Sequence, residues 1–590
     1  MKNLAIFILL IFSVGFSQLF LKEIVHINAG SHGSGYGHIL CGDTDNNGLN
    51  ELIFKRNQNG YITLQVWEYH PTNHYELVWF AVGGQPPPPG GILVGNFAPN
   101  DIGDIDKDSL ADLVGRNTEY YYNDYFHSLV STQESLDSSS FPESLSWYQR
   151  YSSNGAEAAP FYYTGDLDRD GNDEINFVSQ QSGYTHIFEN VANDSNKIVW
   201  SRFQVGACSF AYDDFDLDGR KEFVTANLGS AGRTSVYENA GPDSYELIYQ
   251  DTVRRPNGSD VFPGKDLDGD RKPEFLVCFA QNVGGSTFDY YLYMWETTGN
   301  NTYERNLIDI FRAPWNWSAR SKCGDIDGDG IEEIVWSIGS KVFIYKATGN
   351  NQFQRLWEWT HPYVSCSQVN IYDMNQNGYN EIVITGWEDT WLYEIEALRL
   401  LNPNGGQNFV PGDSILIQWQ KFTPPRCDSF SLSYTIDNGI TYLPILNSIP
   451  STESTYNWII PNTPSESCLI KVTAYGPGTQ FDESDGLFVI QPVGLAETQI
   501  IDQPLRLEIN PNLFKTKTLI RLNKPAEKLI TFKIYNSSGK LVKTLTLSPK
   551  QSAIAWDGTN EHSNSLPNGV YILKLESENL ELIEKIIITR

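Results

Sequence analysis

Apolar residues occur in short runs along residues 19–396, and turn-forming residues separate these runs. A run such as 161–164 leads into an acidic turn, and a run such as 333–336 leaves it. A third run ends in an aromatic residue, often followed by Glu, as in 294–296, and a fourth follows another turn, as in 245–249. Short apolar runs bounded by turn residues are typical of β-strands, so the pattern predicts four antiparallel strands per unit.

The unit occurs seven times, and its acidic turns start 48 to 62 residues apart. Repetition of a four-stranded unit predicts an all-β fold containing a seven-bladed β-propeller. The last unit lacks a fourth run before the pattern changes at Leu398, whereas residues 20–26 resemble a fourth run ahead of the first unit. We therefore predict that residues 20–26 pair with residues 391–395 and close the ring, because closure removes an exposed sheet edge.

Each acidic turn, numbered here loop 1 to loop 7, carries oxygen-bearing side chains at its positions 1, 3, 5 and 9. These residues are Asp43, Asp45, Asn47 and Glu51 in loop 1; Asp104, Asp106, Asp108 and Asp112 in loop 2; Asp166, Asp168, Asp170 and Glu174 in loop 3; Asp214, Asp216, Asp218 and Glu222 in loop 4; Asp266, Asp268, Asp270 and Glu274 in loop 5; Asp325, Asp327, Asp329 and Glu333 in loop 6; and Asp373, Asn375, Asn377 and Glu381 in loop 7. One such turn alone is usually a solvated surface loop. Seven copies with one spacing indicate metal binding.

The spacing suits calcium, which takes roughly six to eight oxygen ligands. Alternation brings positions 1, 3 and 5 to one side of the curling backbone, and the carbonyl of position 7 and the carboxylate of position 9 complete the set. Without a cation, two carboxylates about 4 Å apart repel by roughly 4 kcal/mol at an effective dielectric near 20. We therefore predict structural calcium as the cofactor, with loop 6 the most complete site. Loops 1 and 7 carry the fewest acids, and loops 2 and 5 have Ser109 and Arg271 where glycine would ease the turn at position 6.

The composition and the N-terminus limit the classes of partner. The formal net charge is -30, which argues against nucleic acid and anionic membranes as partners. Residues 1–18 read as a secretory signal peptide, with Lys2 ahead of the apolar stretch 4–12 and small residues near Ser17. No other run approaches the length of a membrane span, so we expect an exported mature protein without one.

The repeated units resemble FG-GAP/VCBS repeats, the calcium-loop blades of integrin α-subunit propellers and of many bacterial surface proteins. The resemblance covers roughly residues 19–396 and rests on the repeated D-x-D-x-D-G-x-x-E turn. It implies that the loops link the first and second strands at one face, and that the opposite face contacts ligands. The connections expected there carry aromatic residues that could stack on a sugar or peptide or could pack between blades, among them 120–126, 161–163, Trp315, Trp317 and Trp387.

Two shorter β-rich segments follow the repeats. Residues 397–491 predict a β-sandwich that resembles fibronectin/Ig-like modules through Gln418-Trp419 and 456–461, with Trp419 and Trp458 in its core. A linker is expected at 492–504, followed by a second Ig-like sandwich at 505–590. Its segments 510–512, 532–536, 556–558 and 567–571 resemble a type IX secretion C-terminal sorting domain, which implies the type IX secretion machinery as a partner and either release or attachment at the outer-membrane surface.

The sequence contains no G-x-S-x-G, H-E-x-x-H or G-x-x-x-x-G-K-[ST] motif. His26, His32 and His38 form the one local group of histidines, for which loop and core roles are expected. The leading prediction is a secreted or surface-displayed, non-catalytic binding or adhesion protein whose ligand is an extracellular glycan or protein. The alternative is a lyase-like propeller enzyme acting on extracellular polysaccharide, which a convergence of Arg, Lys and His on the aromatic face would favour.

Overall fold

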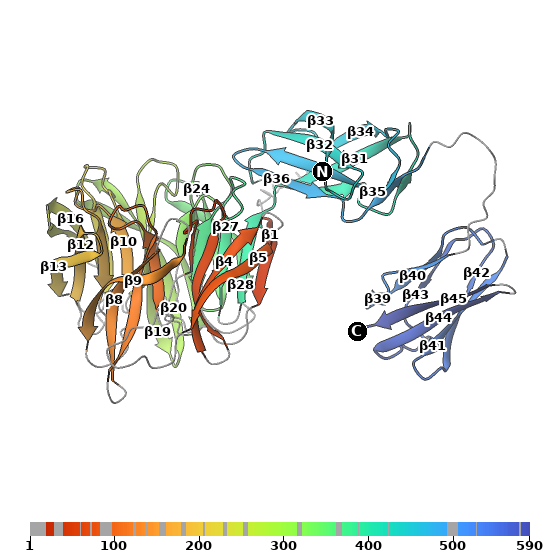
Figure 1. Ribbon diagram of the computed structural model, residues 1–590, viewed down its shortest axis with the longest axis horizontal. Coiled ribbons are helices and arrows are strands. Elements are labelled where there is room, and N and C mark those ends of the chain that lie inside the picture. Colours follow the sequence, from red (N-terminus) through yellow and green to blue (C-terminus); the bar gives the residue numbers. More distant parts are fainter. Residues whose placement is uncertain are drawn as a thin grey trace, which may run out of the picture. The chain divides into compact units, whose positions relative to one another are not determined.

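The computed structural model describes residues 19–28, 39–58, 61–70, 74–82, 97–121, 125–135, 140–152, 161–178, 184–203, 207–227, 233–251, 258–314, 321–360, 368–386, 389–422, 424–492, 506–526, 528–577 and 580–589. The chain divides into two compact units, Met1–Val493 and Gly494–Arg590. Every regular element in the described ranges is a β-strand, which confirms the all-β prediction (Figure 1). Within the same ranges, no helix is long and apolar enough to cross a membrane. The expected signal peptide and nearly all of the expected linker lie outside the described residues.

The first unit contains six four-stranded sheets made of consecutive strands that pair in chain order. Sheet 1 comprises β2 (Leu40–Gly42), β3 (Glu51–Gln58), β4 (Tyr61–His70) and β5 (His74–Val82); sheet 2 comprises β6 (Ala98–Gly103), β7 (Asp112–Tyr121), β8 (Tyr125–Ser135) and β9 (Pro142–Ser152); sheet 3 comprises β10 (Phe161–Gly165), β11 (Glu174–Val178), β12 (Tyr184–Ala192) and β13 (Ser195–Phe203). Sheet 4 comprises β14 (Ala207–Asp213), β15 (Glu222–Asn227), β16 (Thr234–Gly241) and β17 (Ser244–Gln250); sheet 5 comprises β18 (Gly258–Gly264), β19 (Glu274–Gly284), β20 (Thr287–Gly299) and β21 (Thr302–Pro314); sheet 6 comprises β22 (Lys322–Gly324), β23 (Glu333–Ile338), β24 (Lys341–Gly349) and β25 (Gln352–Thr360).

A seventh four-stranded sheet joins the two ends of this region. Sheet 7 comprises β26 (Gln368–Tyr372), β27 (Glu381–Thr385), β28 (Asp389–Ile395) and, from the N-terminus, β1 (Leu21–Asn28). Leu21 pairs with Ile395 and His26 pairs with Trp391, so the predicted pairing of residues 20–26 with 391–395 is confirmed. The imidazole of His26 stacks on Trp391 at 5.1 Å between ring centroids. The pairing continues to Asn28 and Asp389.

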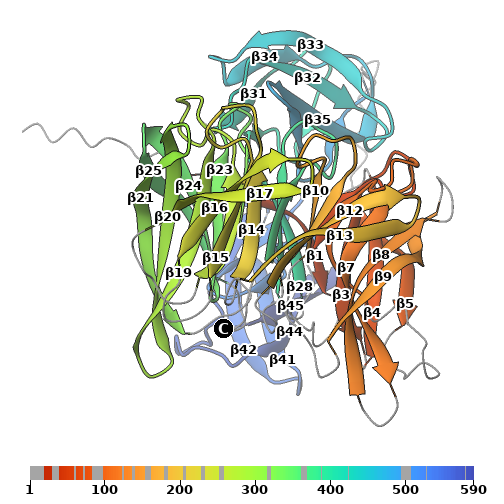
Figure 2. The same cartoon turned by 90° about the vertical axis from the view of Figure 1, so that its left-hand side faces the viewer.

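Sheets that follow one another in the chain are in contact, and several of them are seen in Figure 2. Five pairs of first strands are in contact, namely β2 with β6, β6 with β10, β14 with β18, β18 with β22 and β22 with β26. Between sheets 3 and 4 the contact runs from β11 to β14, and β26 contacts β2. Apolar side chains fill the interfaces: Phe275 and Trp295 are fully buried with Phe215 in one cluster. This arrangement is consistent with a β-propeller.

The rest of the first unit is a β-sandwich that contacts sheet 7. One sheet holds β29 (Leu398–Asn402), β31 (Ser414–Lys421) and β34 (Thr455–Ile459); the other holds β30 (Asn408–Phe409), β37 (Phe488–Ile490), β35 (Ser465–Tyr475), β32 (Ser429–Thr435), β33 (Leu443–Pro450) and β36 (Thr479–Glu483). Trp419 and Trp458 are buried in its core, as predicted. Gln480 fixes the sandwich to the sheet, because its amide nitrogen donates to the Ile395 carbonyl at 2.6 Å and its amide oxygen accepts from Ala397 N–H at 2.9 Å.

The second unit is also built from two sheets. One holds β38 (Leu507–Asn510), β40 (Thr518–Leu522) and β43 (Ala553–Trp556); the other holds β39 (Leu513–Phe514), β45 (Leu580–Ile588), β44 (Gly569–Ser577), β41 (Ile530–Asn536) and β42 (Leu541–Leu547). Trp556 is buried between them and meets Phe514 and Tyr571 edge to face. This packing of two sheets around one apolar core is consistent with an Ig-like sandwich.

Candidate metal centres

Each of the seven acidic loops connects the first and second strands of its sheet, and all seven have the same backbone turn. Position 6 has positive φ in every loop: 87° at Gly48, 76° at Ser109, 102° at Gly171, 95° at Gly219, 74° at Arg271, 89° at Gly330 and 90° at Gly378. Ser109 and Arg271 therefore adopt the same positive φ as the glycines of the other loops. Their side chains make this conformation strained, but the turn is unchanged. In each loop the N–H of position 6 donates to the position 1 carboxylate, for example Arg271 to Asp266 Oδ2 at 2.9 Å.

The position 9 carboxylate is buried below each loop. One of its oxygens accepts the N–H of position 2, for example Phe215 to Glu222 Oε2 at 2.7 Å and Leu267 to Glu274 Oε2 at 2.8 Å. In loops 3, 4 and 5, ligand atoms from positions 1, 3, 5 and 9 all lie within 4.8 Å of one another. The same holds for Asp43, Asp45 and Glu51 of loop 1, and for positions 1, 3 and 5 of loop 2.

Several of these converging oxygens are buried and have no hydrogen-bond donor. They are Glu51 Oε1, Asp104 Oδ1, Asp106 Oδ1, Asp166 Oδ1, Glu174 Oε1, Asp214 Oδ1, Glu222 Oε1 and Glu274 Oε1 in loops 1 to 5, and Asp327 Oδ1 in loop 6. Burial raises the pKa of Glu174, Glu222 and Glu274 to about 9, and that of Glu51 and Asp112 to about 8. A buried carboxylate without a partner is costly, and a calcium ion prefers oxygen donors of this kind. The residues of loops 1 to 5 therefore fit a divalent cation.

A glutamate on the third strand also faces these loops. Glu51 pairs with Glu68, Glu174 with Glu189, Glu222 with Glu238 and Glu274 with Glu296 in the strand registers. In sheet 2 Asp112 pairs with Glu134, and in sheet 7 Glu394 lies one residue beyond the Ile382–Tyr393 pair, opposite Glu381. Glu189 Oε2 and Glu238 Oε2 are buried without a hydrogen-bond partner. The sequence signal was the Glu that follows the aromatic residue of most third runs, and the prediction of the ligands did not use it.

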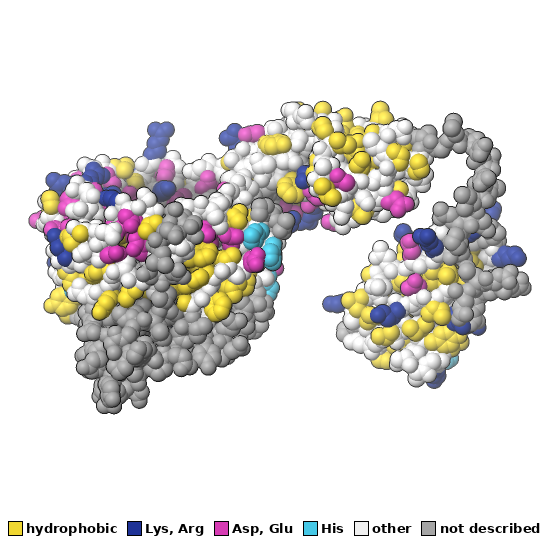
Figure 3. All heavy atoms as spheres, viewed as in Figure 1, with side chains coloured by type: hydrophobic (Ala, Val, Ile, Leu, Met, Phe, Trp, Pro, Cys, Tyr) yellow, Lys and Arg dark blue, Asp and Glu magenta, His cyan; other side chains and the backbone are white. Residues whose placement is uncertain are grey.

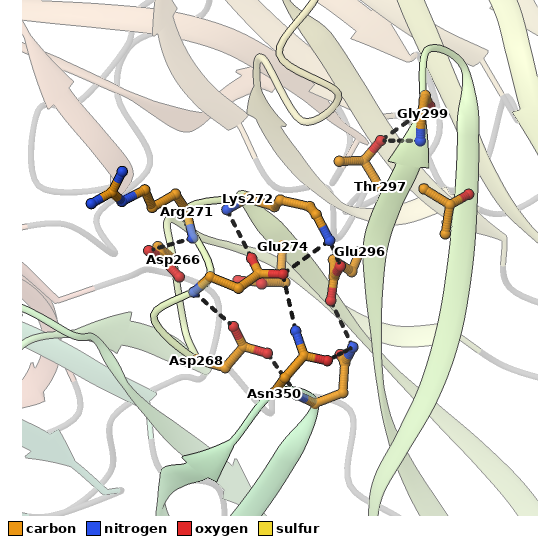
Figure 4. Close-up of polar contacts among 12 residues, drawn as sticks. Asp266, Asp268, Arg271, Lys272, Glu274, Glu296, Thr297, Gly299 and Asn350 are labelled. Carbon is orange, nitrogen blue, oxygen red and sulfur yellow. Dashed lines mark hydrogen bonds and ion pairs between the residues drawn. The ribbon is translucent and has the colours of Figure 1, made fainter.

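Position 3 links four of the loops to the following sheet. The hairpin between the third and fourth strands of that sheet donates a backbone N–H to the position 3 carboxylate: Asp194 to Asp106 at 3.0 Å, Asp243 to Asp168 at 2.6 Å, Asn301 to Asp216 at 2.6 Å and Asn351 to Asp268 at 2.6 Å. Figure 4 shows loop 5, where Asn350 also donates to Asp270 at 3.0 Å. A cation held in such a loop would therefore stabilise the contact between two sheets.

Loop 6 differs from loops 1 to 5 because one lysine contacts three of its carboxylates. Lys346 Nζ lies 2.5 Å from Asp327 Oδ2, 2.8 Å from Asp329 Oδ2 and 2.7 Å from Glu333 Oε1. It therefore contacts positions 3, 5 and 9 together. Burial opposes the charge of Lys346, but Glu333, Asp327 and Asp329 outweigh that effect and raise the pKa of the ammonium group.

Loop 7 is closed by amide groups. Asn375 Nδ2 donates to Glu381 Oε1, and Asn377 Nδ2 donates to Glu394 Oε1. The sandwich covers this loop, since Thr479 N–H donates to the Asn377 carbonyl at 2.7 Å. Position 9 of loop 7 thus has donors for both oxygens, because Met374 N–H donates to Glu381 Oε2 at 2.7 Å.

On the face of the first unit that Figure 3 shows, Asp and Glu side chains are prominent among the described residues, with Lys and Arg interspersed. A cavity of about 520 Å³ lies where the first strands of the sheets converge, and Asp101, Lys322, Cys41 and Cys323 are among the residues that line it. Burial raises the pKa of both thiols, so they are protonated and weakly nucleophilic. The described lining therefore provides no activated cysteine nucleophile.

Most of the other predicted functional residues lie outside the described part of the chain. This applies to His32, His38, Trp315, Trp317 and Trp387, and the side chains of residues 120–126, Phe161 and Tyr162 are also not described. His26 is described, and its Nε2 lies 3.1 Å from Asp389 Oδ1. Tyr163 packs between sheets, because a Cβ built on Gly103 would lie 2.4 Å from its ring. For Tyr163, inter-sheet packing accounts for the aromatic residue.

Comparisons with known protein families give a match in two parts of the chain. A family model described as FG-GAP-like repeat matches residues 325–384, and one described as FlgD Ig-like domain matches residues 512–581. The resemblance to FG-GAP repeats is thus confirmed across loops 6 and 7, and the Ig-like character of the second unit is supported. No curated protein matches the chain.

The solved structures that are similar to the chain at low identity include the following two. One is the full extracellular region of plexin A4, at 8% identity, covering 94% of this chain and 83% of that chain with a TM-score of 0.35. The other is PorZ of Porphyromonas gingivalis, described as an essential bacterial surface component of the type-IX secretion system, at 9% identity, covering 94% and 74% with a TM-score of 0.30. Similarity at this level does not bear on function.

Proposed function

We propose that residues 19–396 form a seven-bladed β-propeller that binds calcium as a structural cofactor through loops 1 to 5. The supporting observation is the set of buried carboxylate oxygens in these loops that have no hydrogen-bond donor. The ligands would be the side chains at positions 1, 3, 5 and 9, joined by the third-strand glutamates. Bound calcium would neutralise them and hold successive blades together. It would take no part in a reaction.

The test of this proposal is the calcium content of the full chain after equilibrium dialysis. The wild-type protein should bind several ions, and Asp268→Ala should lose one, because Asp268 is position 3 of a loop whose acids converge within 4.8 Å. Lys341→Gln is a matched surface control, since Lys341 pairs with Glu358 and not with a loop. Absence of bound calcium in the wild-type protein would refute the proposal.

We further propose that the protein is a secreted or surface-displayed binding or adhesion protein that takes an extracellular glycan or protein ligand. Support comes from the FG-GAP-like repeat, the expected signal peptide at 1–18 and the net charge of -30. An array of glycans and extracellular proteins, probed with the calcium-loaded protein, tests the binding role. Cleavage of array polysaccharides, with no retained binding, would instead indicate the lyase-like alternative.

Residues 505–590 are proposed to act as a type IX secretion sorting domain. The FlgD Ig-like match over 512–581 supports an Ig-like fold, and the segments near 532–536 and 567–571 support the sorting role. Deletion of 505–590 should leave the first unit folded and prevent its passage across the outer membrane. Normal amounts of the truncated protein in the medium would refute the sorting role.

A further inference from the structure

Loop 6 has the same acidic side chains at positions 1, 3, 5 and 9 as loops 3, 4 and 5, but the ammonium group of Lys346 lies among them. Lys346 Nζ contacts carboxylate oxygens from three of the four side-chain positions of loop 6, at 2.5 to 2.8 Å. Calcium would bind the same oxygens at about 2.3–2.6 Å. The ammonium group and a metal ion would therefore have to occupy the same space.

We propose that the ammonium group of Lys346 takes the place of the metal ion in loop 6, so that this loop binds no divalent cation while loops 1 to 5 do. The inference rests on the proposed calcium function of the other loops. The positive charge of Lys346, a residue of the third strand, then neutralises part of the negative charge of the loop 6 carboxylates.

The first argument is the state of the position 9 carboxylate. In loops 1, 3, 4 and 5 its second oxygen is buried and has no hydrogen-bond partner. In loop 6 the corresponding oxygen, Glu333 Oε1, accepts from Lys346 at 2.7 Å. At Glu333 Oε1, Lys346 therefore provides the hydrogen bond and positive charge that the corresponding oxygen lacks in loops 1, 3, 4 and 5.

The second argument is the position of the lysine on its strand. Lys346 lies on β24, one residue beyond the Ile334–Tyr345 pair, and so stands opposite Glu333. The other six sheets have Glu in this place: Glu68, Glu134, Glu189, Glu238, Glu296 and Glu394. Replacement of Glu by Lys changes the local charge by two and leaves a divalent cation with less attraction to the loop.

A lysine near an acidic loop does not by itself replace the ion. In loop 5, Lys272 Nζ lies 2.9 Å from Asp270 Oδ2 and also pairs with Glu296, but Glu274 Oε1 remains without a partner. The Lys272 side chain is 38% exposed, compared with 21% for Lys346. Lys272 therefore borders its loop, whereas Lys346 lies among the ligands.

The third argument concerns the neighbouring sheet. Loops 2 to 5 receive a backbone N–H at position 3 from the hairpin between the third and fourth strands of the next sheet. Sheet 7 has no such hairpin, because its fourth strand, β1, comes from the N-terminus. Lys346 supplies the donor that Asp327 Oδ2 would otherwise lack.

The test measures calcium per full chain at saturation, with Lys346→Glu as the gain-of-site variant. This substitution restores the residue found in the other six sheets, and it should add one ion per chain. Lys341→Glu is the matched control on the same strand and should leave the ion count unchanged. Failure of Lys346→Glu to gain an ion, in a folded protein, would overturn the inference.

A loss-of-site pair keeps the test decisive if Lys346→Glu does not fold. Asp327→Ala should leave the ion count unchanged, whereas Asp268→Ala, at the same position of loop 5, should lose one ion. Loss of an ion from Asp327→Ala would overturn the inference and leave the calcium function of the other loops intact. If the wild-type protein bound no calcium, the proposed function would be overturned, and the proposed difference between loop 6 and loops 1 to 5 would fall with it.

Discussion

Loops 1 to 5 and loops 6 and 7 share one spacing and one backbone turn but differ in what faces their oxygens. In the first group, buried carboxylate oxygens lack donors. In the second group, Lys346 or the amides of Asn375 and Asn377 donate to the position 9 or third-strand carboxylate, and Asp327 Oδ1 of loop 6 is buried without a donor. The same acidic motif therefore occurs with carboxylate oxygens that lack donors and with carboxylates that the protein's own polar groups contact, and the motif alone does not decide which.

The second group also lies where the first sandwich contacts the sheets. Tyr379 Oη donates to the Arg426 carbonyl at 3.2 Å, and a Cβ on Gly378 would lie 2.8 Å from Gly478 Cα. A Cβ on Gly328 in loop 6 would lie 2.8 Å from Pro477 Cβ. The sandwich therefore contacts loops 6 and 7 directly.

Removal of calcium should give the largest effect. A site filled at 100 times its Kd stabilises the fold by about 2.7 kcal/mol, so several sites together reach the net stability of roughly 5–15 kcal/mol of an ordinary domain. Chelation should therefore sharply lower the calorimetric transition of the first unit. The second unit, Gly494–Arg590, has none of the loops and serves as the internal control. An unmoved first transition would mean that the loops are solvated turns.

The pH dependence of the chelated protein should be the next largest effect. Burial raises the pKa of Glu174, Glu222 and Glu274 to about 9, well above that of an unfolded glutamate. The folded state then holds protons that the unfolded state releases, so the free energy of unfolding falls as pH rises from about 4.5 to 9. Denaturant midpoints at pH 5 and pH 8 measure this fall.

Calcium should remove most of this pH dependence in the upper part of the window, because bound metal keeps the carboxylates ionised in the folded state. The calcium-loaded protein is thus the control for the chelated one. If stability fell equally with pH in the presence and absence of calcium, the titrating carboxylates would not be calcium ligands. This result would contradict the assignment of loops 1 to 5.

The repeat and its closing strand could be predicted from sequence, whereas the groups that face the oxygens of each loop could not. Strand order follows from short local runs, and residues 20–26 could be matched to the missing fourth strand by pattern alone. Lys346, which contacts the loop 6 carboxylates, lies 13 residues beyond Glu333 and on another strand. The backbone N–H groups that donate to position 3 of loops 2 to 5 come from a different sheet, as Asn351 does for Asp268. The acidic residues of loop 6 were therefore enough to identify the motif, but they gave no sign that Lys346 contacts it.

A substitution at the contact between loop 7 and the sandwich should have an intermediate effect, independent of calcium. A Cβ on Gly478 would lie 2.4 Å from the Tyr379 ring and 2.8 Å from the Asn377 carbonyl oxygen, so Gly478→Ala must shift this contact. We expect a loss of about 1–3 kcal/mol, the usual cost of overpacking. Gly486→Ala is the control, because its nearest neighbour would lie at 3.6 Å. Equal thermal stability of the two variants would show that this contact does not stabilise the first unit.

The smallest effect should come from position 6 of the loops. Ser109 and Arg271 have positive φ of 76° and 74°, a conformation that costs a residue with a Cβ roughly 1 kcal/mol or more. Ser109→Gly and Arg271→Gly should therefore each stabilise the first unit by up to about 1 kcal/mol, measured by denaturation with saturating calcium. The reverse change, Gly171→Ala, meets no atom within 4 Å at a φ of 102°, so it isolates the backbone term and should destabilise by a similar amount. Destabilisation by Arg271→Gly would show instead that its side chain contributes more to loop 5 than the strain costs.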